Sequence, residues 1–238
     1  MYILIGIQLF IIGLFFLLGW AVKYKGNYGL LSGFSNRPKE EQEQLIQNGY
    51  PQKTGAVLIY TAVGMLLLMP LYFTPFLYAI EVQFGFMLLF LMGGFIYISK
   101  YDVPKKRKRS YIISSLMATI TIGIIVTVFF IGYQNIEVEI YDDSFEINSA
   151  YGGVWNKSDI THIELLDEMP DVTWKINGFG LSTVAKGYFK VEGYGKSLLF
   201  ITKEAPNIYL KVNNEHIFLN GETPEQTKVM FQDLNKIK

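Results

Sequence analysis

Few side chains in this sequence are spaced for catalysis or metal binding. Cysteine is absent from the 238 residues, which excludes disulfides, thiolate nucleophiles and cysteine-bound zinc or iron–sulfur centres. The two histidines, His162 and His216, stand in no HxxH or HExxH spacing that would bring two imidazoles to one metal ion, and we interpret both as partly buried strand residues. No G-x-S-x-G nucleophile motif occurs. The sequence therefore predicts no catalytic residue, no metal site and no cofactor.

A cluster of three acidic residues could take part in chemistry. Asp167, Glu168 and Asp171 surround Pro170. Carboxylates this close together can bind a cation weakly or act as an acid–base pair. They also suit a solvated loop, which is our interpretation.

Three aromatic residues are the best candidates for contact with a partner. Trp174, Phe179 and Tyr194 lie among glycines and polar residues, and exposed aromatic side chains are common at the centre of protein interfaces. A patch formed by these three would bind a protein or a peptide. The competing interpretation places Trp174 in the core of the domain.

A basic run precedes the last long apolar segment. It consists of Lys105, Lys106, Arg107, Lys108 and Arg109. Such a run could bind nucleic acid or act as a targeting signal. Its position directly before residues 111–133 instead favours a topology anchor that touches anionic lipid of the inner leaflet, and we expect no nucleic-acid partner.

Four apolar segments are long enough to cross a bilayer whose hydrocarbon core is about 30 Å thick. They are Tyr2–Val22, Gly55–Tyr72, Leu77–Ser99 and Tyr111–Tyr133. The second and third form a hairpin because Pro70 and Pro75 interrupt the helix between them. A cleaved signal peptide is the alternative for the first segment, but no basic residue precedes Lys23.

The loops between these segments carry the positive charge of the first half. Residues 23–54 hold five Lys and Arg residues and residues 100–110 hold six, whereas the amino-terminal end and the hairpin tip hold none. The positive-inside rule therefore places both loops in the cytoplasm, and the amino terminus and the residues after 133 outside it.

In the first loop, Pro38 and Gly49 delimit a short helix. We expect it to be a solvated connector, because Leu45 and Ile46 are its only large apolar residues.

The net charge of zero is the average of two different halves. Residues 1–133 hold 11 Lys and Arg residues against 5 acidic ones, a balance of +6, and residues 134–238 hold 10 Lys against 16, a balance of −6. Half of the chain is hydrophobic and the mean hydropathy is +0.25, which argues against an ordinary soluble protein. We expect a four-helix transmembrane domain at 1–133 and an acidic domain at 134–238.

The second half has the period-two pattern of half-buried strands. Ile136, Val138 and Ile140 alternate with polar residues, and Asp142-Asp143 forms the first turn. Further strands are expected at Phe145–Asn148, Gly152–Trp155, His162–Leu166, Thr173–Ile176, Tyr188–Glu192, Leu198–Thr202, Ile208–Val212 and His216–Leu219. Thr223 and Gln226 then form a capping box for a final amphipathic helix. This order predicts an antiparallel β-barrel or sandwich closed by a carboxy-terminal helix.

These residues resemble the pleckstrin-homology-like domains that are attached to membrane helices in bacteria. The resemblance covers roughly Ile136–Asn235, and its landmarks are Tyr151-Gly152, Asp159-Ile160, Pro170, Asn177-Gly178, Gly187, Phe189 and Gly193 to Gly195. The first loop, GLLSGFSNRPKEEQEQ, is similar to an uncharacterised membrane family of Gram-positive bacteria. Its placement is also similar, more faintly, to that in immunity proteins against secreted peptide toxins.

The resemblance implies a fold and, by analogy, contact with a protein or a peptide. Phosphoinositide-binding members of the fold use a basic first hairpin, whereas this chain has Asp142-Asp143 at that turn and no Arg after residue 133. Binding of inositol phosphates is therefore disfavoured electrostatically. We expect a non-catalytic binding module of the bacterial plasma membrane, involved in envelope sensing or toxin immunity. The alternative is a small transporter or channel component with an extracytoplasmic cap.

Overall fold

The computed structural model describes residues 2–203 and 206–236. The chain forms two compact units, Met1–Ile124 and Ile125–Lys238. The division falls inside a helix, whereas the predicted boundary between residues 133 and 134 follows the end of that helix. Each unit is described by itself below.

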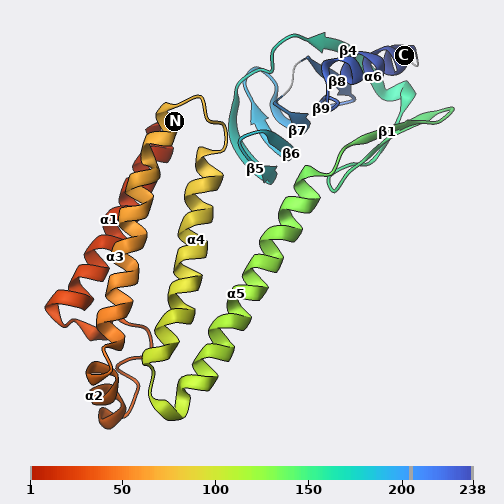
Figure 1. The fold of residues 1–238 in the computed structure, drawn as a ribbon. Helices are drawn as coiled ribbons and strands as arrows, with labels where there is room; N and C mark the ends of the chain where they lie inside the picture. The colour runs from red at the N-terminus through yellow and green to blue at the C-terminus, as the bar shows by residue number, and fades with distance from the viewer. Residues whose placement is uncertain (1, 204–205, 237–238) are drawn as a thin grey trace. The chain divides into compact units, whose positions relative to one another are not determined.

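Four helices are long and apolar enough to cross a membrane, as predicted. They are α1 (Tyr2–Lys25), α3 (Tyr50–Leu68), α4 (Ala79–Ile98) and α5 (Pro104–Tyr133) (Figure 1). Helix α3 begins five residues before the predicted Gly55, because Gly49 ends the preceding helix in a left-handed conformation with φ of 80° and Pro51 suits the first turn of the next. The 3₁₀ helix η2 (Met69–Phe73) contains Pro70 and forms the hairpin tip between α3 and α4.

Glycines allow close approach of the membrane helices. A Cβ atom on Gly19 of α1 would lie 2.7 Å from the carbonyl oxygen of Gly55 in α3, and one on Gly55 would lie equally close to the oxygen of Gly19. On the other side of α3, a Cβ on Gly94 of α4 would lie 2.4 Å from Val57. Small residues at such positions are the usual means of helix packing in lipid, where contact between backbones replaces the hydrophobic effect.

The first loop is more ordered than the sequence predicts. It contains η1 (Tyr28–Leu30) and α2 (Lys39–Gln47). Leu45 is only 1% exposed, and it packs with Phe34 and with Val103 of the loop between α4 and α5. Most of α2 is exposed, as expected of a solvated connector. The burial of Leu45 was not predicted, and this one apolar side chain anchors α2 because the loop itself provides the cluster that covers it.

The second unit contains two sheets and a helix. A three-stranded antiparallel sheet has the order β1 (Glu137–Ile140), β2 (Ser144–Asn148), β3 (Val154–Asn156). A six-stranded sheet has the order β4 (Ile160–Leu166), β8 (Asn207–Val212), β9 (Glu215–Leu219), β7 (Gly195–Thr202), β6 (Val184–Val191), β5 (Val172–Gly180). All strand pairs are antiparallel except β7 with β9, which is parallel because the hairpin of β8 and β9 inserts β9 beside β7.

The main core lies between the two sheets and the carboxy-terminal helix α6 (Pro224–Lys236). Phe145 and Ile147 of β2, the inward residues of β7, β8 and β9, and Leu234 of α6 are all nearly inaccessible. Thr223 caps the helix, since its Oγ1 accepts a hydrogen bond of 3.2 Å from the backbone of Gln226. A second cluster around Tyr209 and Phe218 covers the opposite face of the six-stranded sheet.

Candidate functional site

The predicted aromatic patch is divided between the two faces of the six-stranded sheet. Trp174 pairs with Lys190 and Phe179 pairs with Lys186, so both lie on the face opposite to Phe189. Tyr194 belongs to the other face, where its ring lies 4.9 Å from that of Tyr209. The structure thus brings Trp174 and Phe179 to one face but not Tyr194, and whether any of them binds a partner stays a prediction.

Only one of the three aromatic side chains is largely free. Trp174 is 71% exposed on the edge strand β5, so the interpretation as a core residue is wrong. Phe179 packs on the end of α5, with ring centroids 6.4 Å from Phe129 and 6.2 Å from Tyr133. Its ring also occupies the space beside Gly132, where a Cβ atom would lie only 2.1 Å away.

The hairpin of β5 and β6 therefore holds the carboxy-terminal end of α5. Besides Phe179, the Nζ of Lys186 donates a hydrogen bond to the backbone oxygen of Gln134, just after the helix. A cation is favourable there because the last carbonyls of a helix carry partial negative charge. Lys186 is 6% exposed, and this burial lowers its pKa. The end of α5 is thus a packed part of the second unit rather than a free linker.

Both histidines lie beside Tyr209, on the same face of the six-stranded sheet as Tyr194. The Nδ1 of His216 lies 2.8 Å from the hydroxyl of Tyr209, and burial, followed by the charge of Lys211, lowers the pKa of His216. The side chain of His162 is half exposed and lies 3.1 Å from Glu164, so it is less buried than predicted. Within residues 2–203 and 206–236, no three His, Asp or Glu side chains are grouped as metal ligands. Asp167, Glu168 and Asp171 are exposed.

A groove lies between the edge strand β1 and helix α6. Its volume is about 390 Å³, and apolar side chains from both elements line it: Val138, Ile140, Val229 and Met230. Two of these are substantially exposed, Val229 by 57% and Ile140 by 38%. The charged residues that line the groove are both acidic, Glu225 and Asp233.

The outer face of β1 and β2 adds further negative charge. Glu139 stands directly opposite Glu146 in the strand register, and like charges at paired positions repel each other. The hydroxyl of Tyr141 lies 2.6 Å from one carboxylate and 3.3 Å from the other. Its hydrogen bond to Glu139 is the main reason that the pKa of Tyr141 rises to about 12.

The basic run lies beside the first loop in the membrane unit. The Nζ of Lys106 is 2.7 Å from Glu41 of α2. Arg37 of the same loop binds Asp102, with its two terminal nitrogens 2.7 Å and 3.4 Å from the two carboxylate oxygens. The side chain of Asp102 is only 4% exposed. Lys105, Lys108 and Arg109 are exposed, and Arg107 lies 3.4 Å from the backbone oxygen of Asp102.

Two protein-family models match the chain in succession. Residues 9–102 match a model described as "Domain of unknown function (DUF3784)", and residues 120–235 match one described as "Bacterial PH domain". The C-terminal domain is PH-like. The resemblances to an uncharacterised membrane family and to bacterial pleckstrin-homology-like domains are thereby confirmed, together with the fold of four membrane helices followed by a β-domain that ends in a helix. No curated protein and no solved structure matches the chain.

The PH-like match includes the last turns of α5, in agreement with the packing of Phe179 on that helix. The first hairpin of the PH-like domain has Asp142 and Asp143 between β1 and β2. The turn between these strands is therefore acidic, and the expectation that inositol phosphates are disfavoured stays a prediction.

Sequence reasoning missed the groove and the ion pair. The groove joins β1 with α6, which are separated by 83 residues of intervening chain, so no local sequence pattern could predict it. The ion pair did leave a signal, because Asp102 is the only acidic residue in the basic stretch 100–110. A single carboxylate among six cations is well placed to bind one of the cations of the neighbouring loop.

Proposed function

We propose that this membrane protein is a non-catalytic binding module, and that its PH-like domain recognises an extended, cationic segment of a protein or peptide. The groove between β1 and α6 is the observation that carries the proposal. It combines exposed apolar side chains with an acidic rim. That combination suits a segment in which apolar and basic residues alternate.

The edge of β1 provides the second part of the argument. Strand β1 pairs with β2 on one side and is the outermost strand of its sheet. An extended segment can bind such an edge through backbone hydrogen bonds, while side chains that point to one face enter a groove. Val138 and Ile140 share the face that lines the groove, so an added strand would contact them and α6 together.

The negative charge of the domain indicates that the bound segment is positively charged. The domain from residue 134 carries a balance of −6. Glu225 is exposed, and Asp233 pairs with Lys236 at 2.9 Å through side chains that are 48% and 73% exposed. Such a surface pair is weak, so a lysine or arginine of a bound segment can replace Lys236.

A peptide titration tests the proposal. The probe is a labelled peptide of alternating Lys and Val residues, and binding to the full chain in detergent micelles is followed by fluorescence anisotropy. Substitution of Glu225→Gln and Asp233→Asn together should weaken binding about tenfold, since two rim charges together contribute about 1.4 kcal/mol. The matched control neutralises two exposed acidic residues away from the groove, Asp171→Asn and Glu192→Gln.

Three results together would support the groove as the site. The control variant should bind within about twofold of the wild type, a peptide with Ser in place of Val should bind weakly, and binding should weaken with salt because exposed charges are screened. Equal losses in the groove variant and the control variant would refute the site. They would leave only a general attraction to the acidic domain.

We also propose that the PH-like domain is extracytoplasmic and that residues 23–54 and 100–110 face the cytoplasm. The positive-inside rule supports this orientation. The chain contains no cysteine, so Lys108→Cys and Ser158→Cys, both at exposed positions, can be labelled one at a time in intact cells with a membrane-impermeant maleimide. Ser158→Cys should react and Lys108→Cys should not. The reverse pattern would put the PH-like domain in the cytoplasm.

A further inference from the structure

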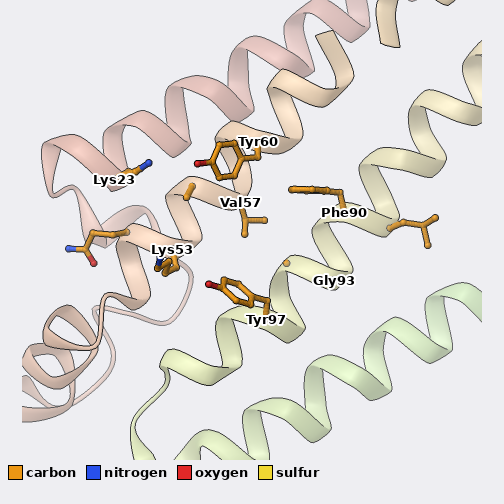
Figure 2. Close-up of a pocket in the computed structure, with 11 residues that line it drawn as sticks. Lys23, Lys53, Val57, Tyr60, Phe90, Gly93 and Tyr97 are labelled. Carbon is orange, nitrogen blue, oxygen red and sulfur yellow. The ribbon is translucent and has the colours of Figure 1, made fainter. Parts of the chain in front are cut away.

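The membrane unit contains a slot that opens between α3 and α4 near the ends that join the basic loops. Figure 2 shows Phe90 and Tyr97 of α4 directed toward α3, whereas the ring of Tyr60 on α3 points toward Lys23. Lys53 and Val57 of α3 and Gly93 of α4 also line the slot. Lys23 of α1 completes the rim. The slot has a volume of about 530 Å³, and the remaining residues that line it are uncharged.

The two lysines at the rim have no carboxylate partner among the described residues. Salt bridges in that part of the chain involve other cations, and no carboxylate lines the slot. The Nζ of Lys23 instead lies 4.9 Å from the ring centroid of Tyr24 and 5.9 Å from that of Tyr60. The Nζ of Lys53 lies 5.6 Å from the ring centroid of Tyr101. The rim thus presents two positive charges that aromatic rings hold in place.

The walls of the slot are apolar below this rim. Leu89 and Tyr97 mark its extent along α4, and eight residues of helix correspond to about 12 Å of depth. Gly93 lines the slot and faces open space, because a Cβ atom at this position would meet nothing within 4 Å. Lysines and tyrosines at the end of a membrane helix lie at the level of the lipid head groups, and the residues one to two turns deeper lie in the hydrocarbon region. A bound molecule would therefore need an anionic head and an apolar tail.

We propose that this slot binds one anionic phospholipid. The phosphate lies between Lys23 and Lys53, and one acyl chain runs along Val57, Phe90 and Gly93. The head group must carry a net negative charge, since the two ammonium groups would repel the cation of a choline head group. The site differs from the basic run at residues 105–109, because it combines charge with a depression that fits a chain. It is also independent of the proposed peptide groove, which belongs to the other unit.

Native mass spectrometry of the full chain tests the proposal. The protein in a neutral detergent is titrated with phosphatidylglycerol or with phosphatidylcholine of the same acyl chains. The wild type should retain one phosphatidylglycerol in preference to phosphatidylcholine. The combined substitution Lys23→Gln and Lys53→Gln should weaken phosphatidylglycerol binding about thirtyfold, as expected for the loss of two lysines at a membrane surface.

Two matched controls separate the slot from general effects. Lys25→Gln with Lys39→Gln removes the same charge from the same loop, outside the slot, and should leave the lipid preference within about twofold of the wild type. Gly93→Leu fills the slot, whereas Gly85→Leu makes the same exchange on α4 at a position that is equally open but does not line it. Gly93→Leu should lose the bound lipid and Gly85→Leu should keep it. Thermal unfolding of both glycine variants verifies that each is folded.

Three results would overturn the proposal. The first is equal phosphatidylglycerol binding by Gly93→Leu and Gly85→Leu. The second is equal binding by the slot and control lysine variants. The third is a change from dimer to monomer in Gly93→Leu in the same spectra, which would mean that a second copy of the chain, rather than a lipid, covers the slot.

Discussion

The ion pair between Arg37 and Asp102 is expected to be the strongest single polar contact between the two basic loops. The side chain of Asp102 is 4% exposed and that of Arg37 is 24% exposed. The same carboxylate accepts a hydrogen bond of 2.8 Å from the backbone N–H of Val103. Replacement of Arg37 by Gln leaves this carboxylate buried without its cation, which typically costs about 3 kcal/mol in the free energy of unfolding.

The double variant provides the decisive comparison. Arg37→Gln together with Asp102→Asn removes both charges, and the loss of a complete buried pair costs much less than the loss of one partner. The coupling energy between the two sites should therefore be about 2 kcal/mol. Lys106→Gln is the control, because its pair with Glu41 has the same 2.7 Å distance but side chains that are 44% and 23% exposed. That substitution should cost less than about 1 kcal/mol.

The cycle compares the wild type, Arg37→Gln, Asp102→Asn and the double variant. For each of them, the free energy of unfolding of the full chain in detergent micelles is measured by denaturant titration. If Arg37→Gln costs no more than Lys106→Gln, burial does not set the strength of these pairs and the reasoning is wrong. The pH dependence is a second check. Burial alone would raise the pKa of Asp102, but the hydrogen bonds from Arg37 and Val103 outweigh it and hold the pKa below its usual value. The pair therefore stabilises the protein at neutral pH, and this contribution is lost as the pH falls below about 4.

Two further predictions concern the PH-like domain. Gly152→Ala should destabilise it by about 2 kcal/mol or more, because the added Cβ would lie 1.8 Å from the backbone oxygen of Ile147. The control Gly153→Ala should cost much less, because its nearest contact would be 3.6 Å away. Thermal unfolding measures both variants. Tyr141 should titrate with a pKa of about 12, and Glu139→Gln should bring that pKa back toward the ordinary value. NMR of labelled tyrosine can follow the titration. An unchanged pKa in Glu139→Gln would contradict the hydrogen bond as the cause of the shift.

Most of the architecture could be predicted because each element carries a local pattern. Four uncharged segments of membrane length and a period-two alternation after residue 136 are read directly from the chain. Pro70 marked the hairpin tip, and Thr223 with Gln226 marked the start of α6. In each case the residues that determine the element are neighbours in the sequence.

The remainder depends on contacts between distant residues. The exposure of Trp174 follows from the position of β5 at the edge of the sheet, and the burial of Phe179 follows from the path of α5. Tyr194 lies on the opposite face because strand register decides which way each side chain points. Leu45 was misjudged for the same reason: a count of apolar residues on one helix says nothing about what the surrounding loop can cover.

The contact between Arg37 and Asp102 has a consequence for membrane insertion. Two side chains 2.7 Å apart cannot lie on opposite sides of a bilayer, so the chain between them must cross the membrane an even number of times. Topologies in which only one of α3 and α4 spans are thereby excluded. Because both loops lie on the same side of the membrane, their eleven Lys and Arg residues favour the same orientation of the protein. A topology reporter placed in either loop must therefore report the same side of the membrane.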